Sequence, residues 1–250
     1  MKLEFYHWSY QCPLNNQMIH LLQEYQDRLA ITIQDISNQP ELARELQMFF
    51  PTLLVVDGKH RYYSPIHKAF LDQLCKGILP KELPYQPVQG TQPYKGRIVP
   101  LTKETMPCAS TCTGCACEAD SKQKYNFLKS LLVNTYGWLH LNPTGELLGG
   151  AEYVPSQCVP YDIPRGDEIA FITCVYMSDE TFDYKSYPLQ KLEEELKKTY
   201  KKVIVISDEV GTFPNGSMEF FKRNGYQDTG VLFRDSYCTL HLMEKELLSL

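Results

Sequence analysis

The sequence predicts a mixed α/β protein built from two domains. Residues 168–177 (EIAFITCVYM) form a run of apolar, β-branched and aromatic side chains without strict alternation, which is typical of a strand buried on both faces of a sheet. Segments on both sides of this run alternate between strand and helix patterns. A stretch rich in proline and glycine separates the two halves. We therefore expect domains at 1–83 and 98–250, joined by an extended linker at 84–97.

The composition is that of an ordinary globular protein and argues against two classes of partner. The 250 residues are 43% hydrophobic and 22% charged, with a formal net charge of −5, which gives no reason to expect a nucleic acid. No apolar run reaches the length of a membrane-spanning helix. Residues 1–20 lack the apolar core of a signal peptide. We expect a cytoplasmic protein with no membrane partner.

The first domain alternates strands and helices and ends with a hairpin and a helix. A turn signal at Asp57–Gly58 joins the two strands of the hairpin. The expected strands are Leu3–Trp8, Leu29–Asp35, Thr52–Val56 and Lys59–Tyr63. The expected helices cover Met18–Tyr25, Pro40–Phe50 and Ile66–Cys75.

This order, with Cys12 at the start of the first helix and Pro51 before the third strand, resembles the thioredoxin fold. The resemblance implies that Cys12 lies at a helix N-terminus, where the helix dipole stabilises a thiolate. Asn15 replaces the resolving cysteine of a C-x-x-C motif, which argues against ordinary dithiol–disulfide exchange. Two interpretations of Cys12 stay open: a reactive single thiol with a redox role, and an inert part of the scaffold.

The second domain reads as a sheet of strands interrupted by helices. Its expected strands are Ile98–Leu101, Gly137–Leu141, Glu146–Val154, Glu168–Met177, Val203–Ser207, Gly230–Phe233 and Cys238–Glu244. Its expected helices are Tyr125–Asn134, Leu189–Lys202 and Ser217–Asn224. The last of these helices stops at Gly225, a residue type that commonly ends helices.

Three stretches of this domain, at 145–156 (GELLGGAEYVPS), 168–177 and 219–230 (EFFKRNGYQDTG), resemble the GNAT superfamily of N-acetyltransferases. The resemblance implies that acetyl-CoA lies between two parallel strands and that an amine of a small molecule or protein attacks its thioester. It also implies that main-chain N–H groups near Val175 and Tyr176 polarise the carbonyl. The sequence leaves the acceptor open.

The same resemblance implies a set of site residues. Glu152 and Tyr176 are the expected catalytic residues, with Glu152 removing the amine proton through a water molecule. A solvent-facing strand position is the alternative for Glu152. The expected cofactor-binding residues are Val175, Tyr176, Met177, Lys185, Ser186, Asn215 and Phe221.

Two features depart from the family pattern. The stretch 179–192 contains no glycine, although a loop that closes on a phosphate normally needs it. Acidic residues accompany this stretch, and Lys185 and Ser186 compensate only in part. Phe221 stands where the family has a tyrosine that protonates the leaving thiolate. Four tyrosines are candidates to replace that hydroxyl: Tyr176, Tyr184, Tyr187 and Tyr237.

Four of the nine cysteines crowd into residues 108–117. Cys108, Cys112, Cys115 and Cys117 are separated by small residues that let the sulfur atoms converge, and four thiolates suit Zn²⁺, Cu(I) or an iron–sulfur cluster. The alternative function is therefore a non-catalytic protein that binds a metal or senses an oxidant. A metal-free loop is the plainer interpretation. We interpret His140 and His241 as strand histidines with hydrogen-bond partners.

Overall fold

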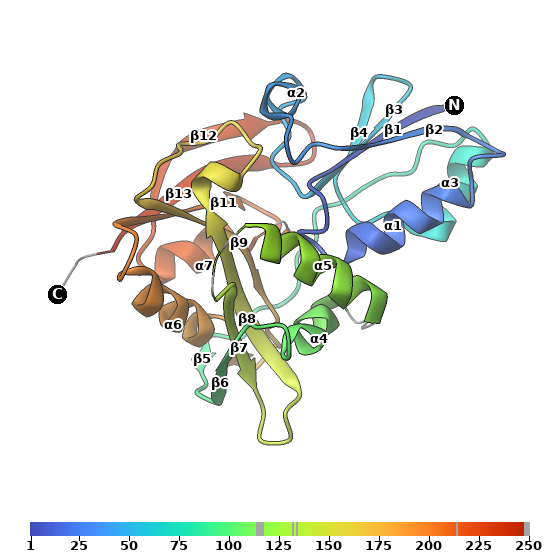
Figure 1. Ribbon diagram of the computed structural model, residues 1–250. Coiled ribbons are helices and arrows are strands. Elements are labelled where there is room, and N and C mark those ends of the chain that lie inside the picture. The colour runs from blue at the N-terminus through green and yellow to red at the C-terminus, as the bar shows by residue number, and fades with distance from the viewer. Residues whose placement is uncertain (114–117, 132, 134, 214, 248–250) are drawn as a thin grey trace. The chain divides into compact units, whose positions relative to one another are not determined.

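The structure, a computed structural model, describes residues 1–113, 118–131, 133, 135–213 and 215–247 (Figure 1). The chain divides into two compact units. Unit 1 consists of Met1–Leu83 with the short segment Pro160–Ile163, and unit 2 consists of Pro84–Val159 and Pro164–Leu250. In the described residues, no helix is both long and apolar enough to cross a membrane.

Unit 1 contains a four-stranded sheet in the order β2-β1-β3-β4. Strand β1 runs parallel to β2 and antiparallel to β3, and β3 and β4 form the hairpin. The strands are β1 (Lys2–His7), β2 (Ala30–Asp35), β3 (Thr52–Val56) and β4 (His60–Tyr62). The helices are α1 (Leu14–Gln23), α2 (Pro40–Glu45) and α3 (Lys68–Cys75).

The element order expected for unit 1 is confirmed, and two helices are shorter than expected: α3 begins at Lys68 rather than at Ile66. Helix α2 ends at Glu45 rather than at Phe50. Gln47 has a left-handed φ of 47°, which a continuing α-helix does not allow. Met48 and Phe50 after it are buried, so this apolar stretch packs as an irregular segment. The likeness to the thioredoxin fold stays a prediction.

Unit 2 is built on a seven-stranded sheet in the order β12-β13-β11-β9-β8-β7-β6. Its strands are β6 (Arg97–Pro100), β7 (Gly137–Leu141), β8 (Leu147–Pro155), β9 (Ile169–Tyr176), β11 (Lys202–Asp208), β12 (Gln227–Arg234) and β13 (Thr239–Glu246). Neighbouring strands are antiparallel except for β9 and β11, which are parallel. The buried strand predicted at 168–177 is thus confirmed in the middle of the sheet.

The ladder between β9 and β11 stops before either strand ends. Its last pair is Phe171 with Ile204, whereas β9 continues to Tyr176 and β11 to Asp208. Thr173 interrupts the other edge of β9, because Ile172 and Cys174 pair with adjacent residues of β8. Such a bulge bends a strand and increases its local twist. We call the stretch of β9 and β11 beyond this last pair the open ladder.

Helices cover both faces of this sheet. The helices are α4 (Met106–Ala109), α5 (Glu118–Ser130), α6 (Ser186–Leu196) and α7 (Met218–Arg223), with short 3₁₀ turns η1 (Ser110–Thr113) and η2 (Ser156–Cys158). Ala151 of β8 packs with α6 and α7 in one core cluster, whereas its neighbour Glu152 contacts α5. Consecutive strand residues point to opposite faces, so α5 lies on one face and α6 and α7 lie on the other (Figure 1).

The stretch 84–97, expected to be an extended linker, lies with unit 2. Within it, β5 (Gln92–Pro93) pairs with β10 (Phe182–Asp183). A Cβ atom on Gly90 would lie 2.5 Å from the main-chain nitrogen of Phe182, so only glycine allows this close approach. The ring of Tyr94 packs against Phe182 and Tyr184 at centroid distances of 5.3 Å. These contacts hold residues 90–94 on unit 2.

Candidate active site

A buried ion pair links α5 to β8. Nζ of Lys124 lies 2.9 Å from Oε1 and 2.7 Å from Oε2 of Glu152, and the exposed fractions of the two side chains are 2% and 1%. The hydroxyl of Tyr176, at the end of β9, donates to the same Oε1 at 2.9 Å. The structure therefore brings together Glu152 and Tyr176, the two residues predicted as catalytic, with Lys124 as a third member.

Burial and charge fix the protonation of this cluster. Burial opposes the charge of Lys124, but the charge of Glu152, its hydrogen bond and the nearby Cys112 and Cys174 together outweigh burial and raise the pKa of the ammonium. Burial and then the charge of Glu152 raise the pKa of Tyr176 well above its ordinary value. The thiols of Cys112 and Cys174 act on both pKa values in the same direction. Lys124 in this cluster is therefore an ammonium, and Tyr176 is a neutral phenol.

Two adjacent glycines in β8 make room for this arrangement. A Cβ atom on Gly150 would lie 2.5 Å from ring atoms of Tyr176. A Cβ atom on Gly149 would overlap the main-chain oxygen of Tyr184. Glycine is the residue that permits such close approach. The Gly-Gly pair therefore lets Tyr176 lie across β8 and reach Glu152, and lets the loop before α6 lie against the same strand.

Lys185, the residue before α6, carries a second buried ammonium. Its exposed fraction is 4%, and Nζ lies 4.8 Å from the centre of the Phe220 ring on α7. Burial lowers the pKa of Lys185 to about 8, although Asp183 and Cys174 act in the opposite direction. Cys174 lies on β9 past its last pair with β11, and α7 follows β11 in the chain. The ammonium of Lys185 thus lies beside the open ladder.

The start of α6 is occupied by a carboxylate. Oδ1 of Asp183 accepts the N–H groups of Lys185 and Ser186, both at 2.9 Å. Its Oδ2 accepts the Ser186 hydroxyl at 2.5 Å. The side-chain amide of Asn224 donates to the Ser186 hydroxyl oxygen at 3.0 Å. Ser186, a predicted cofactor contact, is therefore already bonded to Asp183 and Asn224.

The other predicted cofactor contacts fall into two groups. Val175 and Phe221 belong to the hydrophobic core and are 5% and 0% exposed, so Phe221 is a core residue of α7. Met177 follows the end of β9, where it is exposed and has a φ of 65°. Asn215 is buried, and its Nδ2 donates to the main-chain oxygen of Ile206 at 2.9 Å. Met177 and Asn215 thus adjoin the open ladder.

The predicted metal site falls partly outside the described residues. Cys108 and Cys112 are half-buried thiols on α4 and η1. Cys115 and Cys117 lie within 114–117, which the structure does not describe. In the described ranges, no group of three His, Cys, Asp or Glu side chains is arranged to hold a metal ion. A zinc ion or an iron–sulfur cluster on these cysteines stays a prediction.

Cys12 of unit 1 lies two residues before the start of α1 at Leu14 and is half-buried. Its main-chain oxygen accepts the N–H of Asn15 at 3.0 Å. The side-chain amide of Asn15 donates to the main-chain oxygen of Ser9 at 2.7 Å. Asn15, which stands where a resolving cysteine is expected, therefore fixes the loop that carries Cys12. A redox role of Cys12 stays a prediction.

The two strand histidines both have hydrogen-bond partners on their rings. Nε2 of His140 accepts the N–H of Gly96 at 2.6 Å, and Nδ1 lies 3.1 Å from the main-chain oxygen of Tyr184. This pattern requires the neutral ring with its proton on Nδ1. Burial lowers the pKa of His140, which favours the same form. His140 therefore ties residue 96 to the loop before α6.

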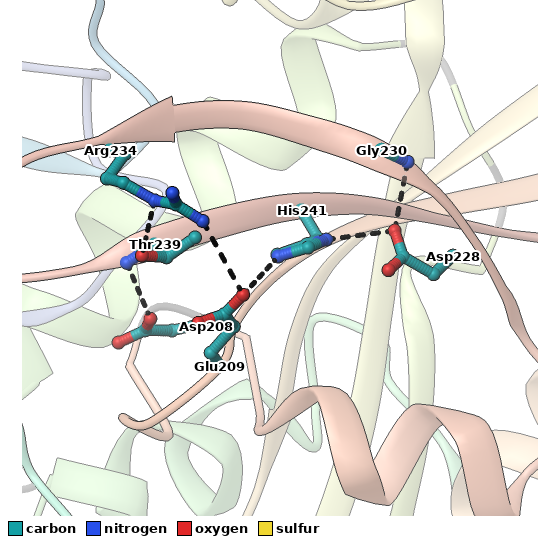
Figure 2. A network of polar contacts seen from close by, with 7 residues as sticks. All are labelled: Asp208, Glu209, Asp228, Gly230, Arg234, Thr239 and His241. Atoms are coloured by element: carbon teal, nitrogen blue, oxygen red, sulfur yellow. Dashed lines mark hydrogen bonds and ion pairs between the residues drawn. The ribbon is translucent and has the colours of Figure 1, made fainter.

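His241 lies between two carboxylates (Figure 2). Nδ1 lies 2.9 Å from Oδ1 of Asp228 on β12, and Nε2 lies 2.9 Å from Oε1 of Glu209, which follows β11. The guanidinium of Arg234 is 4.0 Å from the same Glu209 oxygen. Burial lowers the pKa of His241, but the bonds to Asp228 and Glu209 outweigh it and raise the pKa. The raised pKa favours the charged ring, which links β12, β13 and the end of β11.

Sequence reasoning missed Lys124. The expected helix began at Tyr125, whereas α5 begins at Glu118. The buried face of α5 follows helical spacing but opens with polar side chains: Asp120, Ser121, Lys124, Phe127 and Leu128. A search for apolar periodicity finds only the end of this stripe. The available signal was that Lys124 lies three and four residues before Phe127 and Leu128, on the same helix face. A second signal was the Glu152 carboxylate on a mostly apolar strand, which needs a partner.

No family model matches the chain, and no curated protein matches it. Among solved structures, the chain is similar to a GNAT family N-acetyltransferase from Escherichia coli in complex with CoA, at 13% identity over 63% of this chain and 85% of that chain, with a TM-score of 0.43. It is also similar to an N-acetyltransferase from Staphylococcus aureus Mu50, at 15% identity over 62% and 100%, with a TM-score of 0.45. A third is a ribosomal-protein-alanine N-acetyltransferase from Brucella melitensis, at 13% identity over 60% and 99%, with a TM-score of 0.44.

Proposed function

We propose that unit 2 transfers an acyl group from a thioester, of which acetyl-CoA is the reference case, to an amine of a small molecule or a protein. The observation that carries the proposal is the end of the β9–β11 ladder at Phe171 and Ile204, while both strands continue. Beyond the last pair, parallel strand edges offer main-chain groups to an amide-bearing chain, as in strand addition, although Asp208 at the end of β11 already bridges to Ser217. The pantetheine arm of coenzyme A is such a chain. The GNAT-like motifs at 145–156 and 219–230 support the same function.

Buried polar groups beside the open ladder fit a ligand of this kind. Ser207 lies on β11 past its last pair with β9 and is fully buried, and its hydroxyl has no hydrogen-bond partner in the described residues. A buried hydroxyl without a partner is unfavourable unless something bonds to it. Asn215 holds the main-chain oxygen of Ile206 nearby. We assign both residues to the binding of the acyl donor's arm.

Lys185 is the residue that we assign to proton transfer at the thioester. Its pKa of about 8 is close to that of a thiol, about 8.5. A group with a matched pKa exists in both protonation states near neutral pH and is an efficient acid and base. Neutral Lys185 accepts a proton from the attacking amine and then donates it to the leaving thiolate. Lys185 thus supplies the proton that Phe221 has no hydroxyl to give.

Tyr176 and Glu152 are assigned a joint role beside the carbonyl. The Glu152 carboxylate already accepts from Lys124 and from Tyr176, so its oxygens are engaged by these two side chains. Glu152 therefore acts through Tyr176 as a positioning residue. Tyr176 ends β9, where main-chain N–H groups of Val175 and Tyr176 are proposed to bind the carbonyl oxygen as negative charge develops on it.

Acetyl transfer to a panel of amines tests the proposal. The protein is incubated with acetyl-CoA and, separately, a diamine, an aminosugar and a lysine-containing peptide, and products are identified by mass spectrometry alongside released thiol. Lys185→Met is expected to abolish transfer, whereas Lys191→Met, on the exposed side of α6, retains it. A saturating thioester should also raise the melting temperature, since a ligand at 100 times its Kd stabilises by about 2.7 kcal/mol. The proposal would be overturned if the protein transferred no acyl group and no thioester raised its melting temperature.

A further inference from the structure

The first turn of α6 has almost no main-chain donor left for an anion. The N–H groups of Lys185 and Ser186 are both taken by Asp183. Pro188 has no N–H to offer. Among residues 185–188, all of which the structure describes, only Tyr187 keeps a donor outside this pattern. A helix N-terminus binds phosphate through several such groups at once, and here one carboxylate occupies that position.

A second carboxylate closes the loop that leads into α6. Oδ1 of Asp179 accepts the N–H groups of Thr181 at 2.8 Å and Phe182 at 2.6 Å. The N–H of Phe182 is the largest influence that lowers the pKa of Asp179, so this carboxylate is charged at neutral pH. Glu180, between Asp179 and Thr181, adds an exposed negative charge. The loop therefore presents acidic side chains at the place where an anion would have to lie. Its own N–H groups donate to these side chains and are not free for the anion.

This loop is also fastened on two sides within unit 2. Its main chain pairs with β5 through Phe182 and Asp183, and the N–H of Gly90 donates to the main-chain oxygen of Asp179 at 2.5 Å. On the other side, the main-chain oxygen of Tyr184 lies 3.1 Å from Nδ1 of His140. To expose the N–H groups to a diphosphate, the side chains of Asp179 and Asp183 would have to release them, while these bonds keep the main chain of the loop in place.

We infer that the acyl donor is bound through its thioester and amide-bearing arm, and that the start of α6 holds no diphosphate. The inference rests on the proposed function and narrows its substrate class. The open ladder provides main-chain edges for the arm. At the place where a nucleotide diphosphate would bind, the carboxylates of Asp179 and Asp183 occupy the main-chain N–H groups and repel an anion. The donor class is therefore the acyl-pantetheine type of thioester, for which the nucleotide adds no affinity at this loop.

Paired donors test the inference. Transfer is measured with acetyl-CoA and with S-acetyl-pantetheine, and binding of CoA, pantetheine and inorganic pyrophosphate is measured by calorimetry. We expect kcat/KM for the two donors to agree within about fivefold and pyrophosphate to show no binding, because Asp179 and Asp183 already take the main-chain N–H groups that a diphosphate would use. A preference for acetyl-CoA of about a hundredfold or more would overturn the inference and leave the proposed function standing. Transfer from neither donor would overturn both.

Two variants distinguish the effect of the bonded Asp183 carboxylate from the effect of the loop's overall negative charge. Asp183→Gly frees the N–H groups of Lys185 and Ser186, and it is expected to improve CoA binding relative to pantetheine by about tenfold. Glu180→Gln removes one charge from the same loop and frees no N–H group, so the ratio should stay within about twofold. Asp183→Asn keeps an acceptor for the helix end, in case the glycine variant does not fold, and should raise the ratio by a smaller factor. An unchanged ratio in both Asp183 variants would overturn the inference.

Discussion

Nζ of Lys124 and Oε2 of Glu152 are 2.7 Å apart, and neither side chain has more than 2% of its surface exposed. The pair joins α5 to β8, and Tyr176 of β9 completes it. A buried pair of this kind contributes little net stability compared with apolar residues of the same size, but breaking it leaves a charge with no compensation. Replacing either Lys124 or Glu152 alone should therefore be more costly than replacing both.

We predict that Lys124→Met destabilises the protein by about 3–5 kcal/mol, because the Glu152 carboxylate is left buried without a counter-charge. The double variant Lys124→Met with Glu152→Leu should recover most of this loss. Urea denaturation followed by circular dichroism measures both. Lys191→Met is the control: it removes an ion pair with Glu194 whose side chains are 35% and 60% exposed, and it should cost less than about 1 kcal/mol. Equal effects of the two lysine variants would contradict the prediction.

The strands were predictable because their apolar residues lie next to one another in sequence. The run 168–177 became β9, and the stretches at 137–141 and 203–207 became β7 and β11 with ends shifted by at most one residue. The linker was not predictable in the same way. Its prolines and glycines indicate an extended chain, and the sequence does not show that Tyr94 packs on Phe182 and Tyr184.

The candidate site was predictable only where a resemblance pointed to it. Glu152 and Tyr176 were expected, and they form one hydrogen bond. Lys124 was not, because a buried lysine looks like any exposed lysine until its partner is known. The occupied start of α6 was foreshadowed by the acidic residues of 179–183. Which N–H groups Asp183 would bond depended on backbone geometry that a sequence pattern does not contain.

A second prediction concerns the glycine under the Tyr176 ring. Gly150→Ala places a methyl group 2.5 Å from ring atoms, so the ring must move and its bond to Glu152 is strained or lost. We expect a loss of stability of about 1–3 kcal/mol and a fall in acyl transfer of at least about tenfold, since Tyr176 is assigned to the carbonyl.

Gly166→Ala is the matched control for this change. Its added Cβ would meet Ile169 side-chain atoms at 3.5 Å, an ordinary contact distance, and it lies in a loop of the same unit. Its effect should stay within about 0.5 kcal/mol. Thermal unfolding of both variants makes the comparison. A Gly150→Ala protein as stable and active as Gly166→Ala would show that the ring does not depend on the glycine.

The third prediction is that Lys185→Met stabilises the folded protein while it removes activity. The pKa of Lys185 falls from 10.5 to about 8 on folding. A lowered lysine pKa means that the charged form is disfavoured in the fold, so stability is reduced below pH 8 and recovers as the pH rises toward 10.5. Methionine carries no charge, and the variant should gain up to about 3 kcal/mol at pH 7.

This gain should shrink steadily between pH 8 and pH 10.5, which a merely better-packed side chain would not cause. Urea titrations at pH 7, 9 and 10.5 give the profile, and transfer assays at pH 7 give the expected loss. A variant that is both destabilised and active would argue that Lys185 is structural. Lys185→Arg, whose charge persists at every pH used, should show neither the gain nor the activity.

The last prediction concerns the charged histidine between two strands and a loop (Figure 2). The pKa of His241 is raised on folding, so its contribution is fully present below its unfolded pKa of 6.5 and is lost as the pH rises through the raised folded value. The pKa of its partner Asp228 is lowered, although burial opposes this, so that part is lost as the pH falls below about 4. Lys222 of α7 and Arg234 of β12 are the nearby cations that also act on these carboxylates. The link should therefore be strongest between about pH 4 and pH 6.5.

Replacing His241 with glutamine keeps two hydrogen-bonding groups and removes the charge. We expect His241→Gln to cost about 1–3 kcal/mol at pH 6, the value of hydrogen bonds to a charged group, and progressively less as the pH rises to 9. Free energies of unfolding for both proteins, measured across this range, give the difference. A difference that does not change with pH would mean that the ring is neutral in the fold. A difference that grows with pH would reverse the sign of the pKa shift, since only a lowered pKa makes a histidine more stabilising at high pH.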